Sequence, residues 1–266
     1  MQGLSGIQVP TKKEKAVCPI HHVHLVSIDL VSLGKAKPFC PKCTAETIKQ
    51  EKRQMIDDFK VNNVKDVLKR DSLVDIRDEY DCTFDTFKAQ RGTKEAELKH
   101  RAKMIAYDAI KMPDKPIHAI FYGTPGEGKT HLAMSILNAV NENANPPQKC
   151  LFIDINELIN RIYSSFKNTA KLWNMDYAIK KLRSVDLLVL DDIGSESSMK
   201  SDTSEASNYI QEILKKVLDG QKRLIITTNL TSHQLSQVYN PKIVSRMFAH
   251  SQGYAIDFSG VKDKRY

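Results

Sequence analysis

The fold of this chain is decided by the stretch Gly123-Thr124-Pro125-Gly126-Glu127-Gly128-Lys129-Thr130, which lies between an apolar run (117–122) and a helical pattern (130–140). A glycine-rich loop in this context is typical of a nucleotide-binding P-loop. Its glycines let backbone N–H groups point at phosphates, Lys129 neutralises the β- and γ-phosphate charge, and Thr130 can hold Mg²⁺. We therefore predict ATP or GTP binding by residues 123–130, and we include the next residue, His131, in the set.

Apolar runs that are typical of strands alternate with helical patterns throughout the region that contains this loop. The predicted strands are residues 117–122, 150–155, 187–190, 223–228 and 254–258. Alternation of this kind indicates a parallel sheet with helices covering its faces. The predicted fold class is α/β, with a parallel five-stranded sheet flanked by helices.

Two carboxylates follow the buried strand 187–190, about sixty residues after the loop. Ligands bind at the carboxyl ends of the strands in an open parallel sheet. We therefore expect Asp191 to bind Mg²⁺ through a water molecule and Asp192 to orient or deprotonate the attacking water. Asn229 ends the next predicted strand along the chain, and we expect it to sense the γ-phosphate.

Arg246 lies among apolar residues on a short predicted helix over 241–248. The charge that develops on a transferring phosphoryl group needs a cation, which a neighbouring subunit can supply. We expect Arg246 to act in this way, in trans. The alternative for this residue is a surface ion pair.

The N-terminal region carries a candidate metal site. The pairs Cys18-Pro-Ile-His21 and Cys40-Pro-Lys-Cys43 each have a two-residue spacer and lie about twenty residues apart. Four nitrogen and sulfur ligands suit a closed, structural zinc site, and in a reducing compartment clustered cysteines favour metal over disulfide. His22 and His24 are alternatives to His21 as the fourth ligand.

The chain of 266 residues suits one nucleotide-binding domain with an N-terminal appendage. We predict a zinc-binding module at 1–48, a helical linker at 49–82 and the ATPase domain at 83–266. No apolar run approaches a membrane span, and the N-terminus lacks a signal peptide's apolar core, so we expect a cytoplasmic location without a membrane partner. The formal net charge of +8 is mild support for a polyanionic partner.

A basic and aromatic stretch after the second predicted strand is a candidate surface for single-stranded DNA. Arg161, Lys167 and Lys171 are the expected phosphate contacts. The aromatic residues Tyr163 and Phe166 share a helical stripe with isoleucines, which favours a place in the core.

The motifs Gly-Thr-Pro-Gly-Glu-Gly-Lys-Thr-His-Leu-Ala, Leu-Val-Leu-Asp-Asp-Ile-Gly, Ile-Ile-Thr-Thr-Asn-Leu and Ser-Arg-Met together resemble the AAA+ ATPases of the DnaC/DnaI helicase-loader group. The resemblance covers roughly residues 83 to 258. It implies an AAA+ fold, weak ATPase activity with ATP, and self-association that places Arg246 beside a neighbour's nucleotide. The family's C-terminal sensor arginine has only Arg265 as a candidate here.

The resemblance also implies a function. Proteins of this group deliver a hexameric, DnaB-type replicative helicase onto single-stranded DNA, and an N-terminal region grips the helicase. One alternative is an ATPase partner of a transposase, because IstB-type proteins share the core motifs. Another is a DNA-binding adaptor that uses ATP only as a structural ligand.

Overall fold

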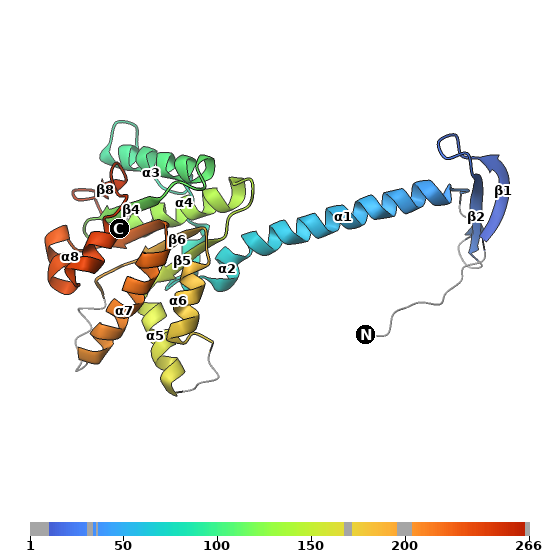
Figure 1. Ribbon diagram of the computed structural model, residues 1–266. Coiled ribbons are helices and arrows are strands. Elements are labelled where there is room, and N and C mark those ends of the chain that lie inside the picture. Colours follow the sequence, from blue (N-terminus) through green and yellow to red (C-terminus); the bar gives the residue numbers. More distant parts are fainter. Residues whose placement is uncertain (1–10, 31–33, 36, 168–171, 196–203, 264–266) are drawn as a thin grey trace. The chain divides into compact units, whose positions relative to one another are not determined.

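A computed structural model of the protein describes residues 11–30, 34–35, 37–167, 172–195 and 204–263 (Figure 1). The chain forms two compact units, residues 1–62 and 63–266. The limits predicted from the sequence are 48 and 82, so the observed division between residues 62 and 63 falls inside the segment predicted as a linker. Among the described residues, no helix has the length and apolarity that a bilayer crossing needs.

The second unit is built on a five-stranded parallel sheet in the order β5-β6-β7-β4-β8. The predicted parallel five-stranded sheet is therefore confirmed. The strands are β4 (Ile117–Tyr122), β5 (Cys150–Asp154), β6 (Leu187–Asp191), β7 (Arg223–Thr228) and β8 (Ala255–Asp257).

Helices cover both faces of this sheet (Figure 1). One hydrophobic cluster joins the sheet to α3 (Lys94–Lys111) and α4 (Lys129–Asn143). The other cluster joins the opposite face to α5 (Ile155–Lys167), α6 (Met175–Arg183), α7 (Ser204–Gly220), α8 (Ser232–Val238) and α9 (Pro241–Met247).

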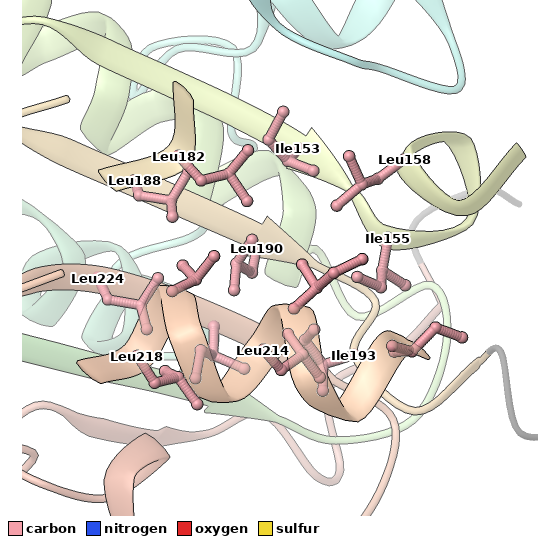
Figure 2. Packing of buried hydrophobic residues seen from close by; sticks show 14 of the residues in the cluster. Ile153, Ile155, Leu158, Leu182, Leu188, Leu190, Ile193, Leu214, Leu218 and Leu224 are labelled. Carbon is pink, nitrogen blue, oxygen red and sulfur yellow. The ribbon is translucent and has the colours of Figure 1, made fainter. Parts of the chain in front are cut away.

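Strand β6 shows why its sequence is a continuous apolar run. Leu188 and Leu190 belong to one cluster, whereas Leu187 and Val189 belong to the other. Figure 2 shows Leu188 and Leu190 on the side of the sheet where leucines of α7 also lie. Successive side chains of a strand point to opposite faces, so both faces of β6 are buried, and its first four positions are apolar before Asp191 ends the strand.

The segment before α3 is attached to the second unit, which explains the observed division. It contains α2 (Val67–Asp71) and a 3₁₀ helix, η1 (Arg77–Asp81). Leu73 forms a parallel bridge to β5, donating from its backbone N–H to the carbonyl of Phe152 at 2.9 Å. Asn138 of α4 holds the end of η1, donating to the carbonyls of Tyr80 and Cys82, each at 2.9 Å.

The first unit contains an antiparallel sheet in the order β1-β2-β3 (Thr11–Val17, His24–Leu30 and Gly34–Lys35), followed by the helix α1 (Pro41–Lys65). The segment predicted as a helical linker (49–82) contains most of the exposed helix α1, then α2, whose Val67 and Leu68 are buried, and η1. The hairpin was not predicted, because β1 is mostly charged and exposed and shows no alternation of apolar and polar residues. Cys18 and Cys40 are the buried apolar residues among the described residues of this unit.

Candidate nucleotide site and metal centre

The loop between β4 and α4 has the backbone of an anion-binding loop. Gly126 and Gly128 have φ values of +85° and +91°, a left-handed conformation that glycine adopts without a steric penalty. Gly128 caps α4, so the free N–H groups of the first helical turn lie at the loop. Lys129 Nζ donates to the carbonyls of Gly123 at 2.9 Å and Thr124 at 2.7 Å, which places the predicted lysine inside the loop.

Two other residues of the predicted nucleotide set make contacts within the protein. Glu127 is only 2% exposed; its carboxylate lies over Gly123, and its Oε2 atom has no hydrogen-bond partner. The Nε2 atom of His131 lies 3.0 Å from the carbonyl of Thr83 and 3.1 Å from the Thr86 hydroxyl. His131 therefore ties the segment that precedes α3 to the first turn of α4.

Asp191 lies at the centre of the site. Its carboxylate accepts a hydrogen bond from the Thr130 hydroxyl at 3.0 Å and one from the Thr227 hydroxyl at 2.6 Å. The structure thus brings together the two predicted Mg²⁺ residues, Thr130 and Asp191, from the P-loop and from β6. Hydroxyl and carboxylate oxygens are the ligands that Mg²⁺ prefers, so this donor set fits the ion.

Asp192 and Asn229, which follow the separate strands β6 and β7, also contact each other. The Asn229 side-chain amide donates to Asp192 Oδ1 at 2.7 Å. Asp192 has a left-handed backbone, with φ of +56°, and its N–H donates to the Thr227 hydroxyl at 2.9 Å. Thr227 belongs to the polar run that ends β7, but the sequence pattern led us to assign a role only to Asn229, because the pattern does not show which hydroxyl reaches Asp191.

Acidic side chains gather at this edge of the sheet. Burial raises the pKa of Asp191 to about 7, although the hydrogen bonds from Thr227 and Thr130 act in the opposite direction. Burial, together with the charges of Asp191 and Asp154, raises the pKa of Glu79 to about 8. A bound divalent cation would favour the ionised carboxylates by supplying the opposite charge.

The two predicted arginines have different outcomes. The Arg246 guanidinium forms an ion pair with Asp219 of α7 and donates to the carbonyl of Lys242 at 3.1 Å. The ion pair that was the alternative for Arg246 is therefore present, and the role of Arg246 in trans stays a prediction. Arg265 lies outside the described residues.

The predicted zinc ligands Cys18, His21, Cys40 and Cys43 form one cluster, with all four ligand atoms within 4.8 Å of one another. The Cys18 and Cys43 sulfurs are 3.7 Å apart, and His21 Nδ1 lies 3.2 Å from Cys43 and 3.7 Å from Cys40. A tetrahedral zinc with Zn–S bonds of about 2.3 Å separates its sulfurs by about 3.8 Å. The donor set and its spacing therefore fit Zn²⁺.

The groups around the cluster support the assignment of these four residues as zinc ligands. The backbone N–H of His21 lowers the pKa of the Cys18 thiol to about 6, which favours the thiolate form that binds metal. Glu46 of α1 lies with its Oε1 atom 3.1 Å from His21 Nε2, on the ring side opposite the sulfurs. His24 instead contacts the carbonyl of Glu14. The carboxylate of Glu46 orients His21, a contact that the sequence did not indicate.

The candidate DNA surface is described in part. Arg161 is exposed and pairs with Glu157 one turn earlier on α5. Lys167 ends α5, but its side chain, like all of Lys171, lies outside the described residues. The predicted core position of Phe166 is wrong, because its side chain is 56% exposed.

Phe166 instead belongs to an aromatic cluster at the surface. Its ring lies 6.1 Å from that of Tyr163 and 5.9 Å from that of Tyr209 on α7. A pocket of about 490 Å³ is lined by Arg161, Ser164, Leu172 and Trp173.

We predict that the purified protein holds about one Zn²⁺ per chain and that Cys40→Ser loses most of it, because three ligands bind zinc far more weakly than four. Elemental analysis after dialysis measures the content. Cys82→Ser is the matched control, since Cys82 is a free thiol outside the cluster. Wild-type protein without zinc, or equal loss in the control, contradicts the prediction.

We also predict that Mg²⁺-dependent binding of a non-hydrolysable ATP analogue weakens as the pH falls below 7. The pKa of Asp191 is about 7, so at pH 6 the ionised fraction is roughly one tenth, and a proton competes with the cation. Mg²⁺ titrations between pH 6 and 8 measure the effect. Asp191→Asn is the control that corrects for the nucleotide's own titration, and an identical pH dependence in this variant would refute the prediction.

Comparison with known proteins places this site in a family. The bacterial DnaA ATPase domain family matches residues 78–253, well over half of the chain. The chromosomal replication initiator DnaA of Streptococcus mutans is 31% identical over 136 residues, which are 51% of this chain and 28% of that protein. The replicative helicase loader DnaC of Buchnera aphidicola (subsp. Acyrthosiphon pisum) is 24% identical over 173 residues, 65% of each chain. The chain thus spans less than two thirds of the length of these curated relatives.

A solved structure agrees on the fold. The crystal structure of the DnaC helicase loader matches with a TM-score of 0.55 and 22% identity, covering 70% of this chain and all of that one. The predicted AAA+ fold is thus confirmed, with the P-loop at the end of β4 and the carboxylates at the end of β6. The chain belongs to the family of the bacterial DnaA ATPase domain, and it resembles the AAA+ helicase loaders of the DnaC/DnaI type.

Proposed function

We propose that the protein is an ATP-dependent loader of a hexameric replicative helicase onto single-stranded DNA during replication initiation. The observation that carries the proposal is the contact network of Thr130, Asp191, Asp192 and Asn229, found on a chain similar to DnaC. The network supports ATP hydrolysis, and the similarity to DnaC supports a replicative helicase as the partner. The ATPase activity is weak, as the family resemblance implies.

Each residue of the network has a role in the proposed hydrolysis. Backbone N–H groups of the loop and Lys129 bind the phosphates, and Thr130 with Asp191 would hold Mg²⁺. The bound ion neutralises charge on the phosphates. Asp192, fixed by the amide of Asn229, orients the attacking water or accepts its proton. Arg246 can contact a neighbouring subunit's nucleotide only after its ion pair with Asp219 breaks. Self-association therefore competes with this ion pair within the chain.

The N-terminal unit is the proposed helicase-binding module. Its buried apolar residues among those described are two of the four candidate zinc ligands, so zinc would replace the hydrophobic core that this unit does not build. The exposed apolar residues Met55 and Phe59, 70% and 71% exposed, give α1 an uncovered surface in the same unit. A folded zinc cluster is then a condition for helicase binding.

The surface near Arg161 is the proposed site for single-stranded DNA. Arg161 supplies positive charge, and the exposed ring of Phe166 supplies a flat apolar face. Cations that contact phosphates and rings that stack on bases are the two components of such sites. Lys167 and Lys171 are proposed as further phosphate contacts.

We predict that the protein forms a complex with the hexameric helicase of its own replication system, that the helicase contact depends on the N-terminal unit, and that the response to ATP depends on the second unit. Size-exclusion chromatography with light scattering, with and without ATP, measures the complex. The double variant Cys40→Ser/Cys43→Ser is expected to lose the complex, whereas Lys129→Ala is expected to retain the helicase contact but lose the nucleotide response.

Three results would count against this proposal. No complex under any nucleotide condition favours the transposase-partner alternative. A complex without measurable ATP turnover, with or without DNA, favours the adaptor. Full retention of the complex by the zinc-ligand double variant places helicase binding elsewhere in the chain.

We further predict that Phe166→Ala weakens binding of a fluorescent oligothymidine by about 1–3 kcal/mol, because one stacked base is lost. Fluorescence anisotropy at a fixed salt concentration measures the change. Tyr107→Ala is the matched control, since Tyr107 is 54% exposed on α3, a helix of the opposite face. Equal weakening in both variants, or none in Phe166→Ala, would exclude this surface.

A further inference from the structure

Thr227 contacts both acidic residues of the nucleotide site through one hydroxyl group. The hydroxyl donates to Asp191 Oδ1 at 2.6 Å and accepts the backbone N–H of Asp192 at 2.9 Å. Thr227 is 1% exposed, so water does not compete for either bond. One buried oxygen thus links a side chain and a backbone that belong to consecutive residues.

The sheet order explains why this position makes the link. Strand β7 lies between β6 and β4, so it neighbours both the strand of the carboxylates and the strand of the P-loop. Leu190 pairs with Ile226 and Phe121 pairs with Thr227. The register therefore sets Thr227 beside the end of β6, next to Asp191.

The hydrogen-bond polarity of this link is fixed. A hydroxyl has one proton, and a backbone N–H can only donate, so the proton of Thr227 goes to Asp191. The bond occupies Oδ1 of that carboxylate and fixes its orientation. The Thr130 hydroxyl of the P-loop lies 3.0 Å from Oδ2 and 3.1 Å from Oδ1, whereas the Thr227 hydroxyl contacts Oδ1 alone, so Oδ2 is the oxygen that Thr227 leaves open on the P-loop side.

The second bond holds the backbone of Asp192. Its φ of +56° is a left-handed conformation, which is unfavourable for a residue with a Cβ atom. The bond from the Asp192 N–H to Thr227 stabilises this turn, and the turn brings the Asp192 carboxylate to the amide of Asn229. The orientation of the second carboxylate thus depends on the same hydroxyl.

From this geometry we propose that Thr227 is the positioning residue that orients Asp191 toward Mg²⁺ and Asp192 toward the attacking water. The inference rests on the proposed ATPase function and deepens it. Thr227 acts only through these two residues, by the side chain of Asp191 and the backbone of Asp192.

The neighbouring residue Thr228 offers a matched comparison. It is also fully buried on β7, and its hydroxyl makes two hydrogen bonds, to the carbonyl of Ile193 at 2.6 Å and from the N–H of Leu230 at 3.1 Å. Neither bond reaches a carboxylate. Valine at either position removes a buried hydroxyl of the same size and kind, but only valine at 227 removes a partner of Asp191.

The test compares the wild type with Thr227→Val, Thr227→Ser and Thr228→Val. We expect Thr227→Val to bind Mg²⁺ roughly 10- to 100-fold more weakly in titrations that follow a fluorescent, non-hydrolysable ATP analogue. Binding of the analogue without Mg²⁺ should change less than about twofold, because the P-loop contacts remain. Thr227→Ser, which keeps the hydroxyl, should restore the Mg²⁺ response, and kcat should follow the same order.

Two outcomes separate this inference from the proposed function. If the wild type shows Mg²⁺-dependent binding and Thr227→Val matches it or matches Thr228→Val, the inference is overturned and the ATPase proposal stands. If the wild type shows neither Mg²⁺-dependent binding nor turnover, the proposed function fails and takes the inference with it. Thermal unfolding of both valine variants shows whether each is folded at the assay temperature.

Discussion

The hydrogen bonds to the carboxylate of Asp191 are the interaction on which the nucleotide site depends. A carboxylate that is 4% exposed is costly to ionise unless donors surround it, and here the donors are the hydroxyls of Thr130 and Thr227. These donors come from the loop after β4 and from the end of β7, while Asp191 ends β6. The carboxylate therefore couples three parts of the chain, and a cation bound there would contact a site whose geometry the sheet has already set.

The sheet can set this geometry because both of its faces are covered. Residues of β6 such as Leu188 and Val189 are buried on opposite sides, in two separate hydrophobic clusters. A strand that is held from both faces has little freedom to shift along its axis, because a shift would disrupt the close packing of its side chains in both clusters. The strand ends are therefore fixed with respect to one another. The turn at Asp192, which makes hydrogen bonds to Thr227 and Asn229, fixes one further residue beyond the end of the strand.

The two units of the chain use different means to become stable. The second unit buries large apolar surfaces on both sides of a sheet, whereas the described part of the first unit buries Cys18 and Cys40. A small module whose described residues bury little beyond two cysteines is stabilised by a cross-link or a metal. The spacing of Cys18, His21, Cys40 and Cys43 fits such a metal, and Glu46 adds the outer contact that orients the histidine. Substitutions in the second unit should therefore destabilise it by disrupting hydrophobic packing. Substitutions of the candidate ligands in the first unit should destabilise it by weakening metal binding.

The sequence by itself determined the class of fold and most of the candidate site, because those features follow from short-range patterns. Strand β6 is a run of apolar residues, the P-loop is contiguous, and Asp191, Asp192 and Asn229 each follow a predicted strand. The role of Thr227, the exposure of Phe166 and the pairing of Arg246 with Asp219 were decided only by the tertiary structure. Each depends on which residue lies opposite on another strand or helix, and a local pattern cannot specify a partner that is distant in the sequence. The strand order, which sets β7 between β6 and β4, is the physical reason that one threonine reaches both carboxylates.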